Sequence, residues 1–345
     1  MVSRYLMVEI SERQQAILKT VVEDFVITAN PVPSDRVTKR SGLKVSSATV
    51  RNEMMELEER GLLTHPHTSS GRVPTDLGYR YYLEHLMTEV GLTPVEQQMI
   101  IHQFHQVETE VDEWGPLAAA VTAQMSRSAA LVTKLQSREG RLKRIELVSV
   151  QDDLVLVVII LHSGALRQRL LRMDLPIERE ELIKLSNRLS DLLKGKDGYQ
   201  IAQVVPNLVG AEREIVQVVA RTMEQDRWNW ADAIHFEGIS FISEQPEFGR
   251  TQQFIDLMEV LQRGGSLMPL LAEVLETGGM RVVIGKENLA EQMQGCSVIL
   301  KRYGPSGEAA GIVGVVGPTR MRYWRAVSLV RFMAGLLDRL VEQPY

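Results

Sequence analysis

The most constraining feature of this sequence is a series of short helical patterns between residues 11 and 60, each ended by a turn signal. In the first, apolar pairs recur every four residues from Ile17 to Val26, which is the spacing of one buried stripe on a helix. Ser11 and Gln14 form a capping-box pattern that marks the start of this helix, and the segment from Asn30 to Pro33 ends it.

Two more helices and a hairpin follow. A helix of barely two turns fits Ser34 to Arg40, because Ser34 can cap it and Gly42 can take the left-handed conformation after it. A longer helix fits Ser46 to Arg60, with its apolar residues on one stripe. Leu62–His65 and Arg72–Pro74 then have the pattern of two strands joined by a turn. This order predicts a helix-turn-helix followed by a hairpin wing.

The charge of this region differs from that of the whole chain. The chain has 39 basic and 44 acidic residues and a formal net charge of −5, which argues against a protein that coats nucleic acid without selectivity. Between Pro33 and Asn52 the only acid is Asp35, whereas the bases are Arg36, Lys39, Arg40, Lys44 and Arg51. An anionic partner would therefore have to meet this local patch. The competing interpretation is a solvated charged face on a helical bundle.

Helix-turn-helix proteins place the second helix in the major groove and use its N-terminal residues on base edges. Because arginine can pair with guanine and asparagine with adenine, we expect Arg51 and Asn52 to read bases. Phosphate contacts are expected from the cations Arg36, Lys39, Arg40, Lys44 and Arg72, and from the hydroxyls of Ser46, Ser47 and Thr49. His67 and Ser69 at the tip of the hairpin would contact the backbone or the minor groove.

The 345 residues predict two or three domains, with a boundary near Val90 to Pro94. Helical spacing continues over 94–113 and 117–135, and three strands of a meander follow at 143–150, 154–161 and 165–173. Helices are expected at 177–193, 211–224, 254–262 and 322–341, and strands at 281–284, 296–303 and 311–316. We expect an α+β, multidomain protein with a central antiparallel sheet.

Other kinds of site have weaker support. The longest apolar run is Leu154 to Leu161, too short to span a membrane, and acidic Glu9 does not fit a signal peptide, so we expect a cytoplasmic protein. His102 and His105 lack a matching third metal ligand. The single cysteine, Cys296, fits a core thiol, and the glycines at 311, 314 and 317 fit tight strand packing better than a nucleotide loop. No cofactor, metal or catalytic residue is expected.

Longer motifs bracket nearly the whole chain. The N-terminal ones are SERQ at 11–14, ATVRNEM at 48–54, LEERGLL at 57–63, PHTSSGRVPTD at 66–76 and GYRYY at 78–82. The C-terminal ones are VIG at 283–285 with Glu287 and Asn288, CSVI at 296–299 and GIVGVVGPTRMRY at 311–323. Together they resemble the bacterial heat-inducible transcription repressors of the HrcA family. Two departures are Asp35, where the family commonly has a basic residue, and Ser47, where it frequently has proline.

The resemblance implies a repressor of heat-shock chaperone operons, released on heat shock, that binds an inverted-repeat operator of the CIRCE type as a homodimer. It also implies that the chaperonin GroEL modulates activity. The implied domains are an N-terminal winged helix over 1–90, a GAF-like antiparallel sheet domain over 91–175 and 263–345, and an inserted dimerisation segment over 176–262. The rival is an enzyme or small-molecule sensor in which the winged helix only docks proteins. A salt-dependent gel shift separates the two.

Overall fold

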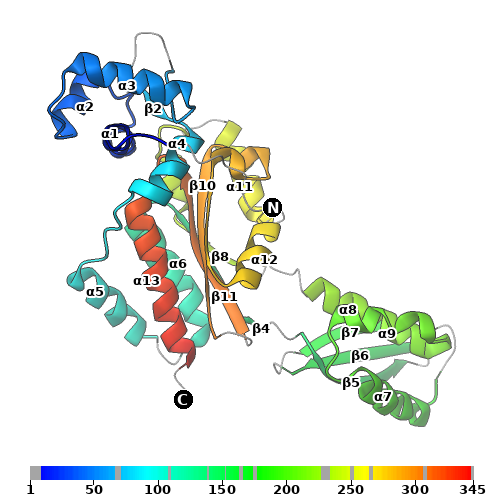
Figure 1. Cartoon of the computed structure of the whole chain (residues 1–345). Helices are drawn as coiled ribbons and strands as arrows, with labels where there is room; N and C mark the ends of the chain where they lie inside the picture. Colours follow the sequence, from blue (N-terminus) through cyan, green and yellow to red (C-terminus); the bar gives the residue numbers. More distant parts are fainter. Residues whose placement is uncertain are drawn as a thin grey trace. The chain divides into compact units, whose positions relative to one another are not determined.

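The computed structural model describes residues 9–66, 71–107, 110–137, 140–151, 153–162, 166–173, 177–226, 234–248, 252–263, 267–305 and 309–342 (Figure 1). The chain divides into two compact units. The first unit comprises residues 1–134, 234–303 and 312–345, and the second comprises residues 135–233 and 304–311. Among the described residues, no helix has both the length and the apolar character needed to cross a membrane.

The first unit begins with the expected winged helix. Its elements are α1 (Glu12–Thr28), α2 (Ser34–Arg40), α3 (Ser47–Glu59), β1 (Leu63–Thr64) and β2 (Val73–Pro74). The capping box of Ser11 and Gln14 is present at the start of α1, and Ala29 ends that helix in the left-handed conformation with φ 53°. The predicted helix-turn-helix and hairpin are therefore confirmed.

A small apolar core and a third backbone pairing hold the winged helix together. Ile17 and Val21 of α1 are fully buried, as are Val37 of α2 and Val50 of α3. Val32, just before α2, pairs with Arg72 through two backbone hydrogen bonds of 2.9 and 3.0 Å. A side chain at Gly71 would collide with the Val32 backbone, so this approach requires glycine.

After the hairpin the chain forms α4 (Asp76–Tyr81) and one π-helical turn at Tyr82–Leu86, and then α5 (Pro94–His105) and α6 (Val111–Ser126). In the described part of the chain, the main sheet has six strands. Five of them lie in the order β8 (Ile234–Glu237), β3 (Ala129–Thr133), β11 (Ala309–Pro318), β10 (Cys296–Tyr303) and β9 (Met280–Ile284), and the sixth, β4 (Gln136–Ser137), pairs with the start of β11. β3 is antiparallel to both β8 and β11, and β9 is antiparallel to β10.

Helices cover both faces of this sheet. α13 (Tyr323–Glu342) and α12 (Met268–Thr277) both pack against β10 and lie on opposite sides of the strands in Figure 1. Burial on both faces explains why the run Cys296–Leu300 is apolar or small without alternation. The remaining elements of this unit are α10 (Ile239–Ser243), α11 (Gln252–Arg263) and the 3₁₀ turns Gly285–Glu287 and Glu291–Met293.

The helix expected over 117–135 is wrong at its C-terminal end, because residues 129–133 form the strand β3. Arg127 ends α6 in the left-handed conformation with φ 55°. All five β3 residues are buried, so the strand carries no alternation that would separate it from a buried helix. The helix expected over 94–113 is likewise two helices, since α5 ends at His105 and α6 begins at Val111.

The second unit is built on the predicted meander. β5 (Leu142–Gln151), β6 (Leu154–Leu161) and β7 (Leu166–Arg172) form a separate antiparallel three-stranded sheet. The inner face of this sheet packs on α7 (Arg179–Leu193) and α9 (Gly210–Asp226) in one apolar core. The smaller elements are β4 (Gln136–Ser137), α8 (Gly198–Ala202) and a 3₁₀ turn at Val205–Asn207.

The division of the chain differs from the one expected. We expected the insertion over 176–262 and placed the meander in the central sheet of the flanking domain. In the structure the meander belongs to the inserted unit, which spans 135–233 and 304–311, whereas 234–262 belong to the first unit. The reason is packing: the apolar inner residues of β5 and β6 are buried by α7 and α9, which follow them in the chain.

Candidate nucleic-acid interface

The N-terminal face of α3 is the first part of the candidate interface. Ser46 caps the helix, with its Oγ accepting a hydrogen bond of 3.1 Å from the backbone amide of Thr49. Its hydroxyl also lies 3.0 Å from the hydroxyl of Thr49. Arg51 and Asn52 follow and are exposed, whereas Val50 and Met54 face the core. The helix start therefore presents a polar surface, as the periodicity predicts.

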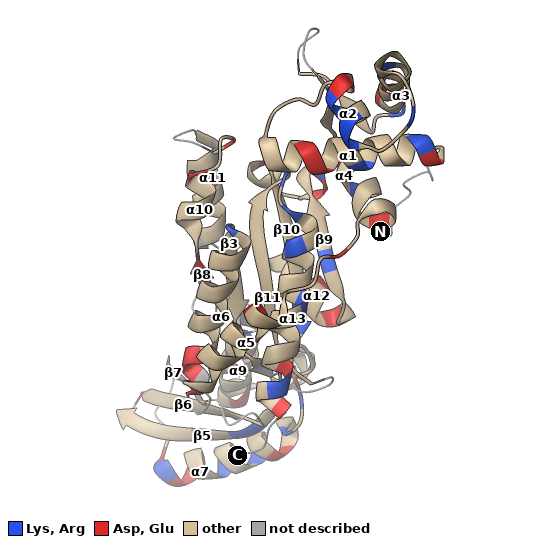
Figure 2. Ribbon diagram, turned by 90° about the vertical axis from the view of Figure 1, so that its left-hand side faces the viewer, with Lys and Arg blue, Asp and Glu red and all other residues tan. Residues whose placement is uncertain are grey.

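Three cations around this face are free of ion pairs. Lys39 at the end of α2, Lys44 in the turn and Arg51 on α3 are exposed, and none forms a salt bridge with any residue that the structure describes. In Figure 2 basic residues, in blue, lie on α2, close to α3. An uncompensated positive charge of this kind is what a phosphate backbone attracts.

Two of the predicted phosphate ligands are held by an acid that sequence reasoning missed. Arg36 lies 2.7 Å, Nε to Oδ2, from Asp24 of α1, and the guanidinium of Arg40 bonds to the other carboxylate oxygen. The side chain of Asp24 is 0% exposed, whereas those of Arg36 and Arg40 are 44% and 46% exposed. Asp24 lies on the buried stripe of α1, seven residues after Ile17, and an acid in that position is the signal that could have identified the contact.

This contact changes the expected role of the two arginines. Their charge is shared with Asp24, so they attach α2 to α1 and offer only the exposed part of each guanidinium to an outside anion. Contact of either arginine with phosphate stays a prediction.

The acidic residues of α3 are turned away from its N-terminal face. Arg13 of α1 binds Glu53, and Gln14 donates a hydrogen bond of 2.8 Å to Glu56. Glu58 binds His65 and lies 2.7 Å from the Nε of Arg72. The partners of these carboxylates therefore lie on α1 and the hairpin, away from the start of α3.

The remaining predicted contacts divide into three cases. Ser47 lies 3.0 Å, hydroxyl to hydroxyl, from Ser34, so it joins the starts of α2 and α3. Arg72 is held by Glu58 and its side chain is only 20% exposed. His67 and Ser69 lie outside the described residues. The structure thus leaves Lys39, Lys44, Ser46, Arg51 and Asn52 exposed and Thr49 partly exposed along α2, the turn and the start of α3, whereas Arg36 and Arg40 are anchored to Asp24.

The weaker candidates have structural explanations. Gly314 lies so close to the carbonyl of Ile299 in the next strand that a side chain would overlap it, which confirms tight strand packing. Cys296 is fully buried, and this burial raises the pKa of its thiol to about 12, so it is a core residue. Among the described residues no group of three or more His, Cys, Asp or Glu is arranged to hold a metal ion.

Known proteins share both the sequence and the fold. Residues 117–327 match the family described as "HrcA protein C terminal domain". A heat-inducible transcription repressor HrcA of Herpetosiphon aurantiacus is 41% identical over 344 residues, which is 98% of this chain and 97% of that protein. The heat-inducible transcription repressor HrcA of Thermomicrobium roseum is 40% identical over 347 residues, which is 97% of this chain and 97% of that protein.

A solved structure adds support for the fold. The crystal structure of a hypothetical protein matches with a TM-score of 0.59 at 19% identity and covers 96% of this chain and 99% of its own. The winged helix, the domain built on the main sheet and the inserted unit are all present. The expected α+β architecture with a winged helix and a GAF-like domain is therefore confirmed. The chain therefore belongs to the HrcA family of heat-inducible transcription repressors, whose members are not enzymes.

Proposed function

We propose that this protein represses heat-shock chaperone operons in the cytoplasm by binding, as a homodimer, an inverted-repeat DNA operator of the CIRCE type. The observation that carries the proposal is the surface at the start of α3, where Lys39, Lys44 and Arg51 have no ion-pair partner among the residues that the structure describes, in a chain with a net charge of −5. A major groove admits such a helix, and the flanking phosphates attract the cations.

Within this surface the side chains have different roles. Arg51 and Asn52 are exposed on the first two turns of α3, the part of a recognition helix that reaches base edges. Lys39 and Lys44 flank that helix and hold phosphates. The amides at the start of α3 carry a partial positive charge that also favours a phosphate oxygen. Sequence preference then comes from Arg51 and Asn52, and most of the salt dependence from the lysines.

The outer face of the meander supports the homodimer. Leu156 of β6 lies between Val148 of β5 and Leu170 of β7, and Ile160 lies beside Leu166. The exposed fractions of Val148, Leu166 and Leu170 are 49%, 55% and 62%, although all three are aliphatic. Exposed aliphatic side chains gathered along β6, with Glu146 and Gln168 beside Val158 between them, are typical of a surface that a protein covers. A second copy would cover it, because a twofold axis brings the same patch of both chains together.

Dimerisation and the inverted repeat are linked by symmetry. Two winged helices related by a twofold axis match two half-sites related by the same axis on DNA. Binding of the second half-site is then intramolecular, which raises affinity by about 100-fold or more without a new kind of contact.

Release on heat shock and modulation by GroEL belong to the same proposal, and family membership supports them. Loss of about 1 to 2 kcal/mol of stability changes the folded fraction several-fold, so a chaperonin that folds the repressor would set its active concentration. The test adds purified GroEL to an operator-binding assay at a growth and a heat-shock temperature. A higher active fraction with the chaperonin is expected, and an unchanged fraction would remove GroEL from the mechanism.

The central experiment compares an inverted-repeat operator with a scrambled duplex of equal length over a range of salt concentrations. We expect selective binding by the wild-type chain. Arg51→Ala should lose about 1–3 kcal/mol on the operator and little on the scrambled duplex, because the lost contact is to a base. Equal losses on both duplexes would contradict the base-reading role. A wild-type chain without operator preference would favour the rival, a winged helix that docks proteins.

A further inference from the structure

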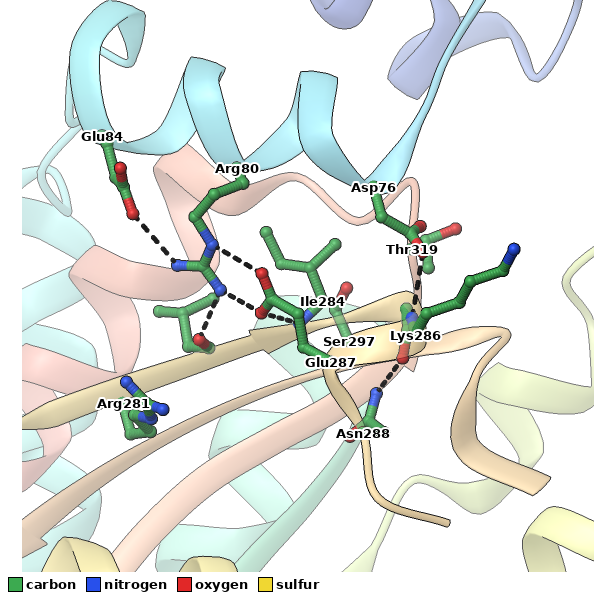
Figure 3. A network of polar contacts seen from close by, with 12 residues as sticks. Asp76, Arg80, Glu84, Arg281, Ile284, Lys286, Glu287, Asn288, Ser297 and Thr319 are labelled. Carbon is green, nitrogen blue, oxygen red and sulfur yellow. Dashed lines mark hydrogen bonds and ion pairs between the residues drawn. The ribbon is translucent and has the colours of Figure 1, made fainter. Parts of the chain in front are cut away.

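Two motifs that the DNA-binding surface does not use meet in the structure. The first, residues 78–82, lies on α4 and the turn after it, directly behind the hairpin. The second, residues 283–288, ends β9 and forms the 3₁₀ turn at the edge of the main sheet. Figure 3 shows the side chains of α4 pointing at that turn. More than 200 residues separate the partners in sequence, with separations of 207 and 210 for the two main contacts.

The first contact is a two-point ion pair. The Nε of Arg80 donates a hydrogen bond of 2.9 Å to Oε1 of Glu287, and its Nη2 bonds to Oε2. Nη2 also donates a hydrogen bond of 2.8 Å to the carbonyl of Val282 on β9. Glu287 is itself fixed in position, since its Oε2 accepts a hydrogen bond of 2.9 Å from the backbone amide of Ile284. The exposed fractions of Arg80 and Glu287 are only 15% and 19%, so water competes weakly for this pair.

The second contact comes from the same face of α4, one turn earlier. Oδ2 of Asp76 accepts a hydrogen bond of 2.9 Å from the backbone amide of Lys286. Gly285 lies under this carboxylate at φ 53°, and any side chain there would overlap it. Asn288 braces the turn by donating from Nδ2 to the carbonyls of Gly285 and Met293, at 2.8 and 3.0 Å. The turn is thus shaped to receive α4.

Aromatic packing completes the contact. Tyr79 and Tyr82 of the first motif are almost fully buried. Their rings face those of Tyr323 and Trp324 at the start of α13, with centroid distances of 5.7 and 6.5 Å. Burial raises the pKa of Tyr79 well above its usual value, and the neighbouring phenol of Tyr323 raises it further, so the Tyr79 phenol stays neutral. The polar pair and the rings therefore fix α4 on two sides.

α4 is equally well joined to the hairpin. The hydroxyl of Thr75 accepts a hydrogen bond of 3.0 Å from the amide of Gly78 and donates one of 2.6 Å to the carbonyl of Gly61, the residue before the hairpin. Gly78 lies against the carbonyl of Leu62, where a side chain would not fit. A fixed α4 therefore also fixes the hairpin and the helix before it.

We propose that two contacts, the Arg80–Glu287 ion pair and the hydrogen bond from the amide of Lys286 to Asp76, form a joint between the winged helix and the sheet domain. This joint determines the distance between operator half-sites at which the dimer binds. This proposal rests on the function proposed above. Arg80 and Glu287 are positioning residues that do not touch DNA. If the winged helix were free to turn on the sheet domain, the two recognition helices could reach half-sites at several separations. Held by the joint, each winged helix keeps one orientation on its sheet domain, which narrows the separations that the two helices fit, because half-sites must lie about one helical turn, or a multiple, apart on one face of DNA.

The test measures affinity for a series of inverted repeats whose central spacer is changed one base pair at a time, up to about half a helical turn. Arg80→Gln is the main variant, because it leaves Glu287 free to keep its hydrogen bond to the amide of Ile284. Glu287→Gln is the second variant. Glu84→Gln is the matched control, because Glu84 lies 3.8 Å from Arg80, belongs to the same helical segment and is 52% exposed. A single half-site is included as a duplex to which spacing is irrelevant.

Wild type and Glu84→Gln should lose affinity about 10-fold or more when the spacer changes by half a turn, since one half-site then faces away. Arg80→Gln and Glu287→Gln should keep single half-site affinity and reduce that spacer penalty to within about 3-fold. Variants that bind the half-site and retain the full spacer penalty would refute the role proposed for the joint and leave the proposed operator function intact. If a variant fails to fold, the other carries the test. Wild type without any spacing preference would overturn the dimeric operator function as well, so the two failures are distinguishable.

Discussion

Within the described residues, the start of α3 in the winged helix and the outer face of the meander in the inserted unit are both exposed, and the two surfaces differ in chemistry. On α3 the uncovered face is polar, with Arg51 and Asn52 outside a stripe of buried apolar residues. On the meander the uncovered face is aliphatic, with Leu166 and Leu170 exposed beside half-buried residues of β6. An exposed cationic face suits a polyanion, and an exposed aliphatic face suits another protein surface. In the function proposed above, one chain separates DNA recognition from assembly.

Buried polar groups differ between the two regions as well. In the winged helix the side chain of Asp24 is buried, and its two arginine partners reach it from α2. In the described part of the inserted unit, two buried serines of α7, Ser186 and Ser190, bond to the backbone of Ile145 in β5. The Asp24 contact limits how far Arg36 and Arg40 are available to an outside anion. The serines only provide hydrogen-bond partners for buried backbone groups of the sheet. The following predictions test this distinction.

The largest expected effect comes from an acid on the apolar face. Leu170→Asp should abolish dimerisation, because a charge would be buried at the contact, and should weaken operator binding by about 100-fold or more through loss of the second half-site. Sedimentation and operator titration measure the two changes. Val209→Asp is the control, since Val209 is 80% exposed before α9 and lies on none of the three strands. A Leu170→Asp chain that stays dimeric would show that the meander is not the interface.

The next effect comes from Asp24→Asn. Loss of the buried carboxylate should lower the free energy of unfolding by about 1–3 kcal/mol, because a charge-assisted hydrogen bond from Arg40 and the ion pair with Arg36 are lost. At the same time Arg36 and Arg40 become available to phosphate, so binding to random DNA should strengthen and its salt dependence should steepen. Denaturant titration and anisotropy measure the two changes. Asp35→Asn, on the exposed side of α2, is the control for a simple change of net charge.

A smaller effect is expected in the inserted unit. The Oγ of Ser190 accepts 2.9 Å from the amide of Ile145, and Ser190→Ala would leave that buried amide without its partner. We expect a loss of about 1 kcal/mol in the stability of this unit, measured by denaturant titration, with the affinity of the intact dimer for operator unchanged. Ser149→Ala, on the exposed part of β5, should change neither property. A loss of operator affinity in Ser190→Ala dimers would contradict a purely structural role.

The smallest effect is that of Lys39→Ala. Its side chain is exposed and has no ion pair within the described chain, so stability should not change. Affinity should fall about 3-fold on all duplexes alike, and the salt slope should decrease by about one, as for the loss of one phosphate contact. A loss confined to the operator would assign Lys39 a base contact instead. Titration of operator and random duplexes at several salt concentrations decides between these outcomes.

Local patterns were sufficient for much of this molecule. Stripes at helical spacing, with Ser11, Ser46 and Gly71 at element ends, predict the winged helix almost residue by residue, because caps and periodicity act within a few positions. The strand-like runs at 143–150, 154–161 and 165–173 likewise predict the meander. The outward position of Arg51 and Asn52 follows from the same helical period.

Long-range packing decided the rest. Local periodicity could not identify β3, because a strand buried on both faces has no polar phase, and it could not assign the meander to its own unit, since that depends on which helices cover it. The pairing of Asp24 with α2, and of Arg80 with Glu287 across 207 residues, arises only when distant segments meet in the folded chain. The periodicity of apolar side chains depends only on residues that are near one another in sequence. Ion pairs of this kind form only when folding brings together residues that are far apart in sequence.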